Sequence, residues 1–218
     1  MSKRYYWKKI RPILLSVVIC SMFFLIIIGV TSNRTGNLTI FVDRNSPTKC
    51  LSLSESQLLT NPQGKLYGPA INEAWDTTED YLPKYADLID GNNSGTNYIA
   101  YTFYLYNSGI ESLDYSMKFT IENVSNKLDE AIRIRLYTND QLVTYSKINS
   151  VSGEAENGTD AFESDKYITT NTVTDFDPGE VTKYTIMIWV ESYDPDCTND
   201  KIGGSITLSM SFSVLGIV

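Results

Sequence analysis

Two stretches near the C-terminus restrict the fold of this chain more than any other feature. Residues 205–214 alternate strictly between apolar residues and Ser or Thr, and residues 181–190 carry apolar residues at both odd and even positions. Side chains along a strand point to opposite faces with a period of two. The first stretch therefore predicts a strand with one buried and one solvent-exposed face. The second predicts a central strand that is covered on both faces.

Strand patterns of the same kind recur through much of the chain, at residues 38–42, 98–106, 115–122, 132–136, 142–148 and 167–173. They are separated by short turns such as Phe176-Asp-Pro-Gly-Glu180, and no long soluble helix is evident. About eight strands of this type predict an all-β fold, an antiparallel β-sandwich of the jelly-roll or immunoglobulin-like kind. Residues 43–96 lack the pattern and contain four prolines. They predict an irregular insertion with short helices that form a small lobe or lid.

The N-terminus predicts a membrane segment. Residues 13–30 form an 18-residue run without charge, which follows five Lys or Arg residues within the first eleven positions. A helix of roughly 20 apolar residues spans a bilayer, and basic flanks stay on the cytoplasmic side. We therefore expect a single-pass signal-anchor at residues 13–30 in contact with the lipid bilayer. Residues 1–12 would be a cytoplasmic tail, residues 31–37 a linker, and residues 38–218 an extracellular domain.

A second interpretation of the same run is a signal peptide. Cleavage after a small residue near Thr31 or Ser32 would release a secreted domain instead of a tethered one. The run is long for the apolar part of a signal peptide, and no A-x-A-like cleavage site follows it. The sequence therefore favours the anchor over the secreted form.

Composition excludes several classes of function. The chain contains no His, which removes His-based acid–base catalysis, Ser-His and Cys-His pairs, and His-containing zinc sites. Residues 31–218 hold 13 basic residues (18 minus 5) and 26 acidic ones, a net charge of −13. A surface this acidic repels nucleic acid, so no nucleic-acid partner is expected. No catalytic motif is present, and we predict a non-enzymatic protein without a cofactor other than a candidate calcium ion.

The loop at residues 194–200 is the candidate calcium site. Asp194, Asp196 and Asp200 alternate along it, and hard cations prefer several carboxylates close together. The loop departs from the EF-hand pattern, with Asn199 at the sixth position and Ser205 at the twelfth. A capped acidic turn is the alternative.

Two cysteines of the predicted extracellular part, Cys50 and Cys197, are candidates for a disulfide in an oxidising compartment, with free thiols as the alternative. Four tyrosines of one predicted strand, Tyr98, Tyr101, Tyr104 and Tyr106, form a candidate surface for carbohydrate or a partner protein. Their alternative role is cross-strand packing.

Five segments together with the N-terminal run carry a family resemblance: residues 97–107 (NYIAYTFYLYN), 129–133 (DEAIR), 176–180 (FDPGE), 183–189 (KYTIMIW) and 194–200 (DPDCTND). Across residues 97–214 the chain resembles exported proteins of Gram-positive Firmicutes. More distantly it is similar to the TasA/camelysin group, which implies a jelly-roll sandwich and a role as a subunit of biofilm-matrix fibres. The metalloprotease activity described for camelysin-type proteins is not implied, because the chain lacks His and a matching metal motif.

We therefore expect a membrane-anchored cell-envelope protein that acts by binding or self-association. Its partner would be an envelope protein, a glycan or a second copy of the chain, and strand addition at a sheet edge is one mode of association. One alternative is a secreted, TasA-like fibre subunit. The other is an envelope glycan hydrolase with an Asp/Glu pair, drawn from acids such as Asp175, Asp177, Glu180 and Glu191.

Overall fold

The computed structural model of the chain describes residues 37–43, 50–69 and 76–218. The predicted cytoplasmic tail, the anchor at residues 13–30 and residues 31–36 of the linker lie outside these ranges. No helix within the described ranges is long and apolar enough to cross a membrane. Residues 36–218 form one compact unit.

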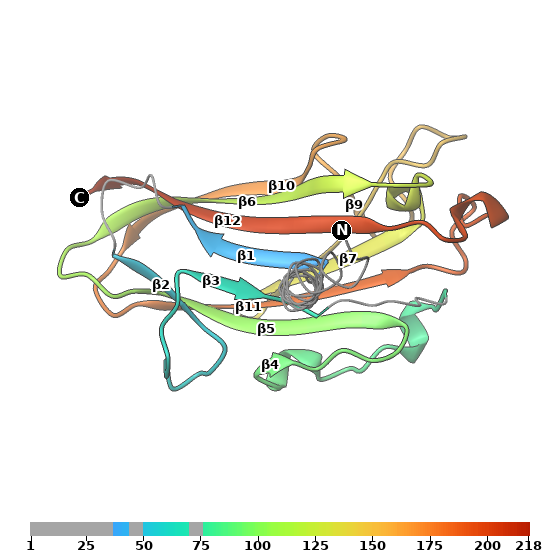
Figure 1. Cartoon of the computed structure of the whole chain (residues 1–218). Helices are drawn as coiled ribbons and strands as arrows, with labels where there is room; N and C mark the ends of the chain where they lie inside the picture. Colours follow the sequence, from blue (N-terminus) through green and yellow to red (C-terminus); the bar gives the residue numbers. More distant parts are fainter. Residues whose placement is uncertain (1–36, 44–49, 70–75) are drawn as a thin grey trace, which may run out of the picture. The chain divides into compact units, whose positions relative to one another are not determined.

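Sheet A has five strands, in the order β10-β6-β12-β1-β3 (Figure 1). Their bounds are Tyr167–Phe176 for β10, Leu113–Val124 for β6, Ile206–Ile217 for β12, Leu38–Val42 for β1 and Lys65–Tyr67 for β3. Neighbouring strands are antiparallel except β1 and β12, which run parallel with Leu38 beside Leu208. β1 and β12, the first and last strands of the described chain, thus pair within this sheet.

Sheet B has seven strands, and six of them follow the order β2-β5-β11-β7-β8-β9. Their bounds are Leu51–Ser54 for β2, Tyr98–Asn107 for β5, Val181–Val190 for β11, Ile132–Thr138 for β7, Gln141–Ser146 for β8 and Asp160–Ala161 for β9. The seventh, β4 (Gly91–Asn92), shares the outer edge of β5 with β2. Only β8 and β9 pair in parallel.

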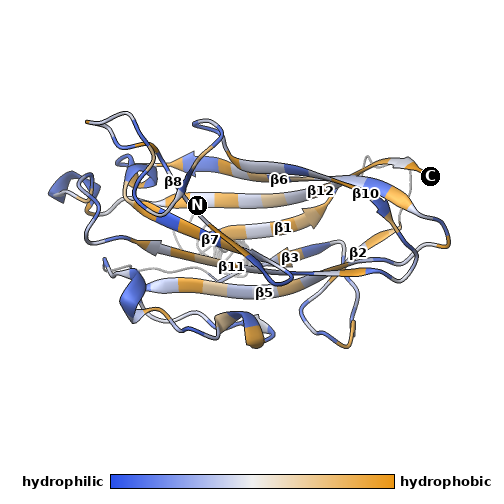
Figure 2. Cartoon of the chain, turned by 180° about the vertical axis from the view of Figure 1, so that it is seen from behind, coloured by the Kyte–Doolittle hydropathy of each residue, from blue (hydrophilic) through white to orange (hydrophobic). Residues whose placement is uncertain are grey.

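The apolar faces of the two sheets meet in one core. Phe103 of β5 stacks on Tyr184 of β11 with ring centroids 5.4 Å apart, and Phe212 of β12 packs against both rings. The alternating residues of β12 are buried as predicted: Ile206, Leu208, Met210, Phe212 and Val214. Figure 2 shows the apolar and polar residues alternating along the strands. The prediction of an all-β fold is confirmed.

The second predicted feature, a central strand covered on both faces, is also confirmed. Tyr184, Ile186 and Ile188 of β11 point into the core between the sheets. Met187 and Trp189 point the other way and are buried beneath Leu82 and Ala86, which belong to a segment that covers the outer face of sheet B. That covering segment contains two short 3-10 helices, η1 (Glu79–Tyr81) and η2 (Ala86–Leu88).

The predicted irregular insertion at residues 43–96 is more regular than expected. It contains β2, β3 and β4 in addition to η1 and η2. These strands have four, three and two residues, which is too short for a period of two to stand out in the sequence. They form only because longer strands offer them an edge for pairing. Two further 3-10 helices, η3 (Leu128–Glu130) and η4 (Asn199–Lys201), lie in connecting loops.

Candidate functional site

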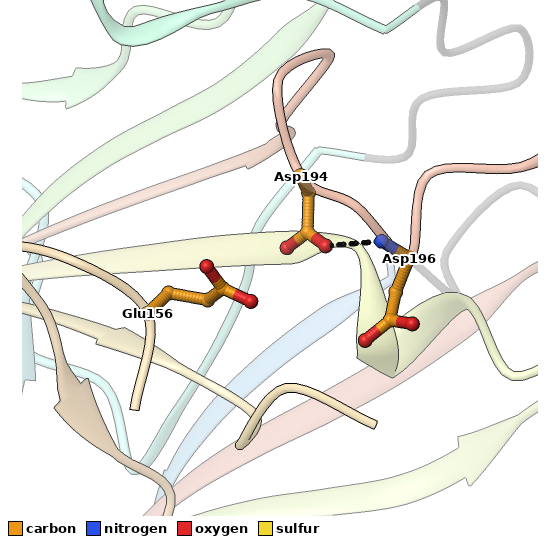
Figure 3. Close-up of side chains that lie close together, drawn as sticks. All are labelled: Glu156, Asp194 and Asp196. Carbon is orange, nitrogen blue, oxygen red and sulfur yellow. Dashed lines mark hydrogen bonds between the residues drawn. The ribbon is translucent and has the colours of Figure 1, made fainter. Parts of the chain in front are cut away.

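The acidic loop between β11 and β12 brings two of the three predicted calcium ligands together. Asp194 and Asp196 lie close to each other, and the Asp196 N–H donates to Asp194 Oδ1 at 2.7 Å (Figure 3). Glu156, from the loop between β8 and β9, is the third member of this cluster. One carboxylate oxygen of each lies within 4.8 Å of the others. We call Glu156, Asp194 and Asp196 the acidic cluster.

The third predicted ligand, Asp200, does not join the acidic cluster. Its carboxylate accepts hydrogen bonds from the Thr198 hydroxyl and, at 3.1 Å, from Lys201 Nζ. The structure therefore does not bring Asp200 together with Asp194 and Asp196, because the loop turns after Thr198 and η4 directs this side chain to a lysine. Glu156 was missed because only the fold brings the two loops together.

A guanidinium lies within the acidic cluster. Arg133 Nη1 donates to Asp194 Oδ2, and Nη2 lies 3.9 Å from Glu156 Oε2. The Asp194 side chain is fully buried and that of Arg133 is 7% exposed. Asp196 is held by Ser150, whose N–H donates at 3.0 Å and whose hydroxyl also donates. The cluster thus joins β7 to two loops through a buried ion pair.

The environment shifts the pKa values of the two aspartates in opposite directions. Burial raises the pKa of Asp194, although the Asp196 N–H and Arg133 oppose this shift. Burial also acts on Asp196, but its hydrogen bonds from Ser150 outweigh it and lower its pKa. The three carboxylates could supply oxygen ligands to calcium, which takes six to eight in proteins. Arg133 already supplies a cation to this group.

A pocket of about 380 Å³ lies beside the acidic cluster. Arg133, Thr144 and Trp189 come from β7, β8 and β11 and form its floor on the outer face of sheet B. Residues 78–80 and residues 156–159 line it as well, and Glu191 and Tyr193, which follow β11, complete the lining. The sequence did not predict this pocket, because its lining comes from five separate segments.

The floor of the pocket is built from paired polar and aromatic groups. Trp189 is 2% exposed, and its Nε1–H donates to Glu191 Oε2 at 2.8 Å. The Arg135 guanidinium lies 5.3 Å from the centroid of the Trp189 ring and pairs with Glu79. These contacts fix the indole ring and the wall that η1 provides.

The four predicted surface tyrosines do not form one exposed surface. Tyr101 points into the core and its hydroxyl donates to Glu55, whereas Tyr104 is buried on the outer face and donates to Asp90 at 2.5 Å. Tyr98 packs on the outer face and Tyr106 is partly exposed. The prediction is wrong because a period of two places Tyr101 opposite the other three. Burial, together with the acceptor carboxylates, raises the pKa of Tyr101 and of Tyr104.

Cys50 and Cys197 are free thiols, so the structure contradicts the predicted disulfide. The Cys50 carbonyl accepts from Ser108 N–H, just beyond the end of β5 where β11 begins. Cys197 donates its N–H to the Asp194 carbonyl in the loop after β11. The ten residues of β11 therefore separate the two thiols. Burial raises the pKa of the Cys197 thiol, and the acidic neighbours Asp76 and Asp194 add to this.

The acids named for a glycan hydrolase lie at opposite ends of β11. Asp175, Asp177 and Glu180 lie at or after the end of β10, in and around the turn that leads into β11, whereas Glu191 follows its last residue. Glu191 is therefore separated from the other three by the whole strand.

Comparisons with known proteins add little. No family model and no curated protein matches the chain. A solved structure, the β-glucosidase from Kluyveromyces marxianus in complex with glucose, is similar at 15% identity and a TM-score of 0.26. The match covers 82% of this chain and 17% of that one. A likeness at this TM-score carries no argument. The fold and the pocket define the class, a two-sheet all-β domain with a polar pocket on one outer face, and membership of the TasA/camelysin group stays a prediction.

Proposed function

We propose that the chain is a non-enzymatic cell-surface protein, tethered to the membrane by residues 13–30, whose β-sandwich self-associates through the free edge of β10. The strand order supports a jelly roll, with β1-β12-β6-β10 opposite β5-β11-β7-β8. The parallel pairing of β1 with β12 departs from that all-antiparallel arrangement. The order is in keeping with the resemblance to the TasA/camelysin group.

The observation that carries this proposal is the edge strand β10. It has ten residues and pairs with β6 on one side, and none of the strands within the described ranges pairs with its other side. Thr170, Asn171, Thr172 and Thr174 are exposed, and residues 167–174 contain neither a charge nor a proline. Natural proteins usually protect long edges with charged residues or prolines, because an open edge is a template for another strand. This edge is therefore suited to strand addition.

The hydrogen-bonding groups of β10 show where a second strand would pair. The Thr170 N–H points away from β6 and donates to Glu163 Oε1 at 2.6 Å. Successive N–H groups of a strand alternate in direction, and the ladder with β6 is regular from Thr169 to Val173. The Thr172 backbone therefore also faces away from β6. Antiparallel pairing of two copies about Thr172 would continue sheet A across a two-fold axis.

Cysteine cross-linking tests this pairing. In the full chain, with Cys20, Cys50 and Cys197 replaced by Ser, a Thr172→Cys substitution would place two thiols at cross-strand distance, about 5.5 Å between Cα atoms. We expect a disulfide-linked dimer on the surface of the expressing cells. Ser152→Cys, in an exposed loop, is the matched control. Equal amounts of dimer from both variants would contradict self-association through β10.

Fractionation of the same cells tests the tether. A full-length mass in the membrane fraction is expected for a signal-anchor. A mass that begins near Ser32 or Asn33, recovered from the medium or from a pelletable polymer, would replace the tether with the secreted fibre-subunit alternative. Either location is compatible with the pairing of β10, so the two results are independent.

A further inference from the structure

The pocket on the outer face of sheet B has a function beyond self-association: we infer that it binds a neutral saccharide. Its floor follows from strand register. Trp189 lies beside Tyr98 on one side and Arg133 on the other, and Arg133 lies beside Ser146. These side chains form one row across four strands on the face that points away from the core. Trp189 and Arg133 of this row line the concavity of about 380 Å³, and such a mixture of polar and aromatic groups matches the usual make-up of a small-ligand site.

Several polar groups of the pocket have no hydrogen-bond partner in the described parts of the chain. Thr78 is 8% exposed, and its hydroxyl makes no hydrogen bond to any residue that the structure describes, including the N–H groups of η1, which it precedes. Within the described ranges, Arg133 Nη2 and Glu156 Oε2 have no hydrogen bond, because the 3.9 Å that separates them is too long for one. A buried hydroxyl and a buried Nη2 group without hydrogen bonds are costly, even though Nη1 of the same guanidinium pairs with Asp194. A ligand that offers both donors and acceptors would satisfy them.

An aromatic ring stands beside these groups. Tyr193 lines the pocket and is 80% exposed, and within the described ranges its ring stacks on no other ring. Flat aromatic rings offer rigid contact area at a low cost in conformational entropy. Sugar rings present apolar C–H faces to such surfaces and hydroxyl groups at their edges. The pocket thus combines a stacking surface with unpaired hydrogen-bonding groups.

The charge of the pocket selects a neutral ligand. Four carboxylates line it, those of Glu79, Asp80, Glu156 and Glu191, together with the single guanidinium of Arg133. An anionic ligand would be repelled by this excess. A cationic ligand finds most carboxylates engaged, because Glu79 pairs with Arg135, Glu156 accepts from the Asn149 amide at 2.8 Å, and Glu191 accepts from the Trp189 N–H. Hydroxyl groups, which both donate and accept, fit such a mixed lining.

Fluorescence of Trp189 reports on the pocket directly. The chain has three tryptophans, and replacing Trp7 and Trp75 by Phe leaves Trp189 as the only one. The full chain, in a detergent without a sugar headgroup, would be titrated with cellotetraose, maltotetraose and chitotetraose. A tetramer of galacturonate and a tetramer of glucosamine serve as the anionic and cationic comparisons. We expect a saturable change in emission with at least one neutral tetramer and weaker binding of both charged ones.

Two substitutions separate binding from folding. Thr78→Val removes a hydroxyl without a protein partner, and Tyr193→Ala removes an exposed ring, so each should leave stability nearly unchanged. Each should weaken binding about tenfold, the loss expected for one hydrogen bond or one stacking contact. Tyr85→Ala is the matched control, since Tyr85 is 70% exposed and does not line the pocket. Its affinity should equal that of the parent.

Three outcomes would overturn the inference: no response to any neutral tetramer, equal affinity in the Thr78→Val and Tyr193→Ala variants, or a preference for a charged tetramer. The same samples are assayed for newly formed reducing ends. Their release would leave saccharide binding in place and overturn the non-enzymatic part of the proposed function. None of these outcomes bears on the pairing of β10, which cross-linking at Thr172 tests separately.

Discussion

Replacing Arg133 should destabilise the chain more than any single change at its surface. Arg133→Met removes the cation from a group of three carboxylates that lie within 4.8 Å of one another. The side chain of Asp194, its direct partner, is fully buried, and Arg133 is 7% exposed. Breaking a buried ion pair from one side leaves an uncompensated charge and costs about 3–5 kcal/mol. For a unit of this size we expect the melting temperature to fall by about 6–20 °C.

The measurement is urea unfolding of the full chain in detergent, followed by circular dichroism. Asp165→Asn is the control, because Asp165 is 90% exposed and shares Lys147 with Asp129. It should cost less than about 1 kcal/mol. The double variant Arg133→Met/Asp194→Leu should recover much of the loss, since no unpaired charge remains between them. A loss below about 1 kcal/mol in Arg133→Met would refute the role given to this pair.

Calcium provides a second test of the same cluster. Because Arg133 already supplies a cation to Asp194 and Glu156, millimolar calcium should stabilise Arg133→Met and leave the parent chain unchanged. An increase in the melting temperature of the parent would show that the acidic cluster binds the ion despite Arg133.

Three further predictions concern pH, the thiols and the core. The pKa of Asp196 is lower in the folded chain than the value of about 3.9 in the unfolded chain, so its ionisation stabilises the fold above that value. This stabilisation is lost as the pH falls through the folded pKa. Ser150→Ala should reduce the pH-dependent loss of stability, measured by urea titrations at acidic pH. Titration of the unfolded chain without reductant should find the thiols of both Cys50 and Cys197, and reductant should not change the melting temperature; a shift would indicate a disulfide. Ile134→Ala should cost about 2–5 kcal/mol, because Ile134 is fully buried between the sheets, whereas a loss near zero would contradict close packing there.

The long strands were predictable because the alternation of apolar and polar residues is a property of consecutive positions in the sequence. The alternation of residues 205–214 determines which side chains of β12 are buried, whichever strands flank it. The apolar residues on both faces of residues 181–190 likewise required a cover on the outer face, and residues around Leu82 and Ala86 provide it. Strands of two to four residues were not predictable, since nothing in so short a segment distinguishes a strand from a loop.

The candidate site was predictable only in part, for a physical reason. Asp194 and Asp196 are two residues apart, so local spacing was enough to associate them. Glu156 and Arg133 join them through the pairing of β7, β8 and β11, which no local pattern encodes. The prediction of a tyrosine surface was wrong because it grouped four residues by their proximity in sequence. In the strand, Tyr101 points to the face opposite Tyr104.

The sequence by itself determined the all-β class, the positions of the long strands, the acidic charge of residues 31–218 and the absence of His-based chemistry, because these follow from composition and from a period of two. Only the tertiary structure decided which loops meet, which strand remains an open edge, that ten residues of β11 separate the two cysteines, and that five segments enclose a pocket above Trp189. Such features depend on strand order between and within two sheets. That order is set by the burial of the whole core and is not contained in any single stretch of the chain.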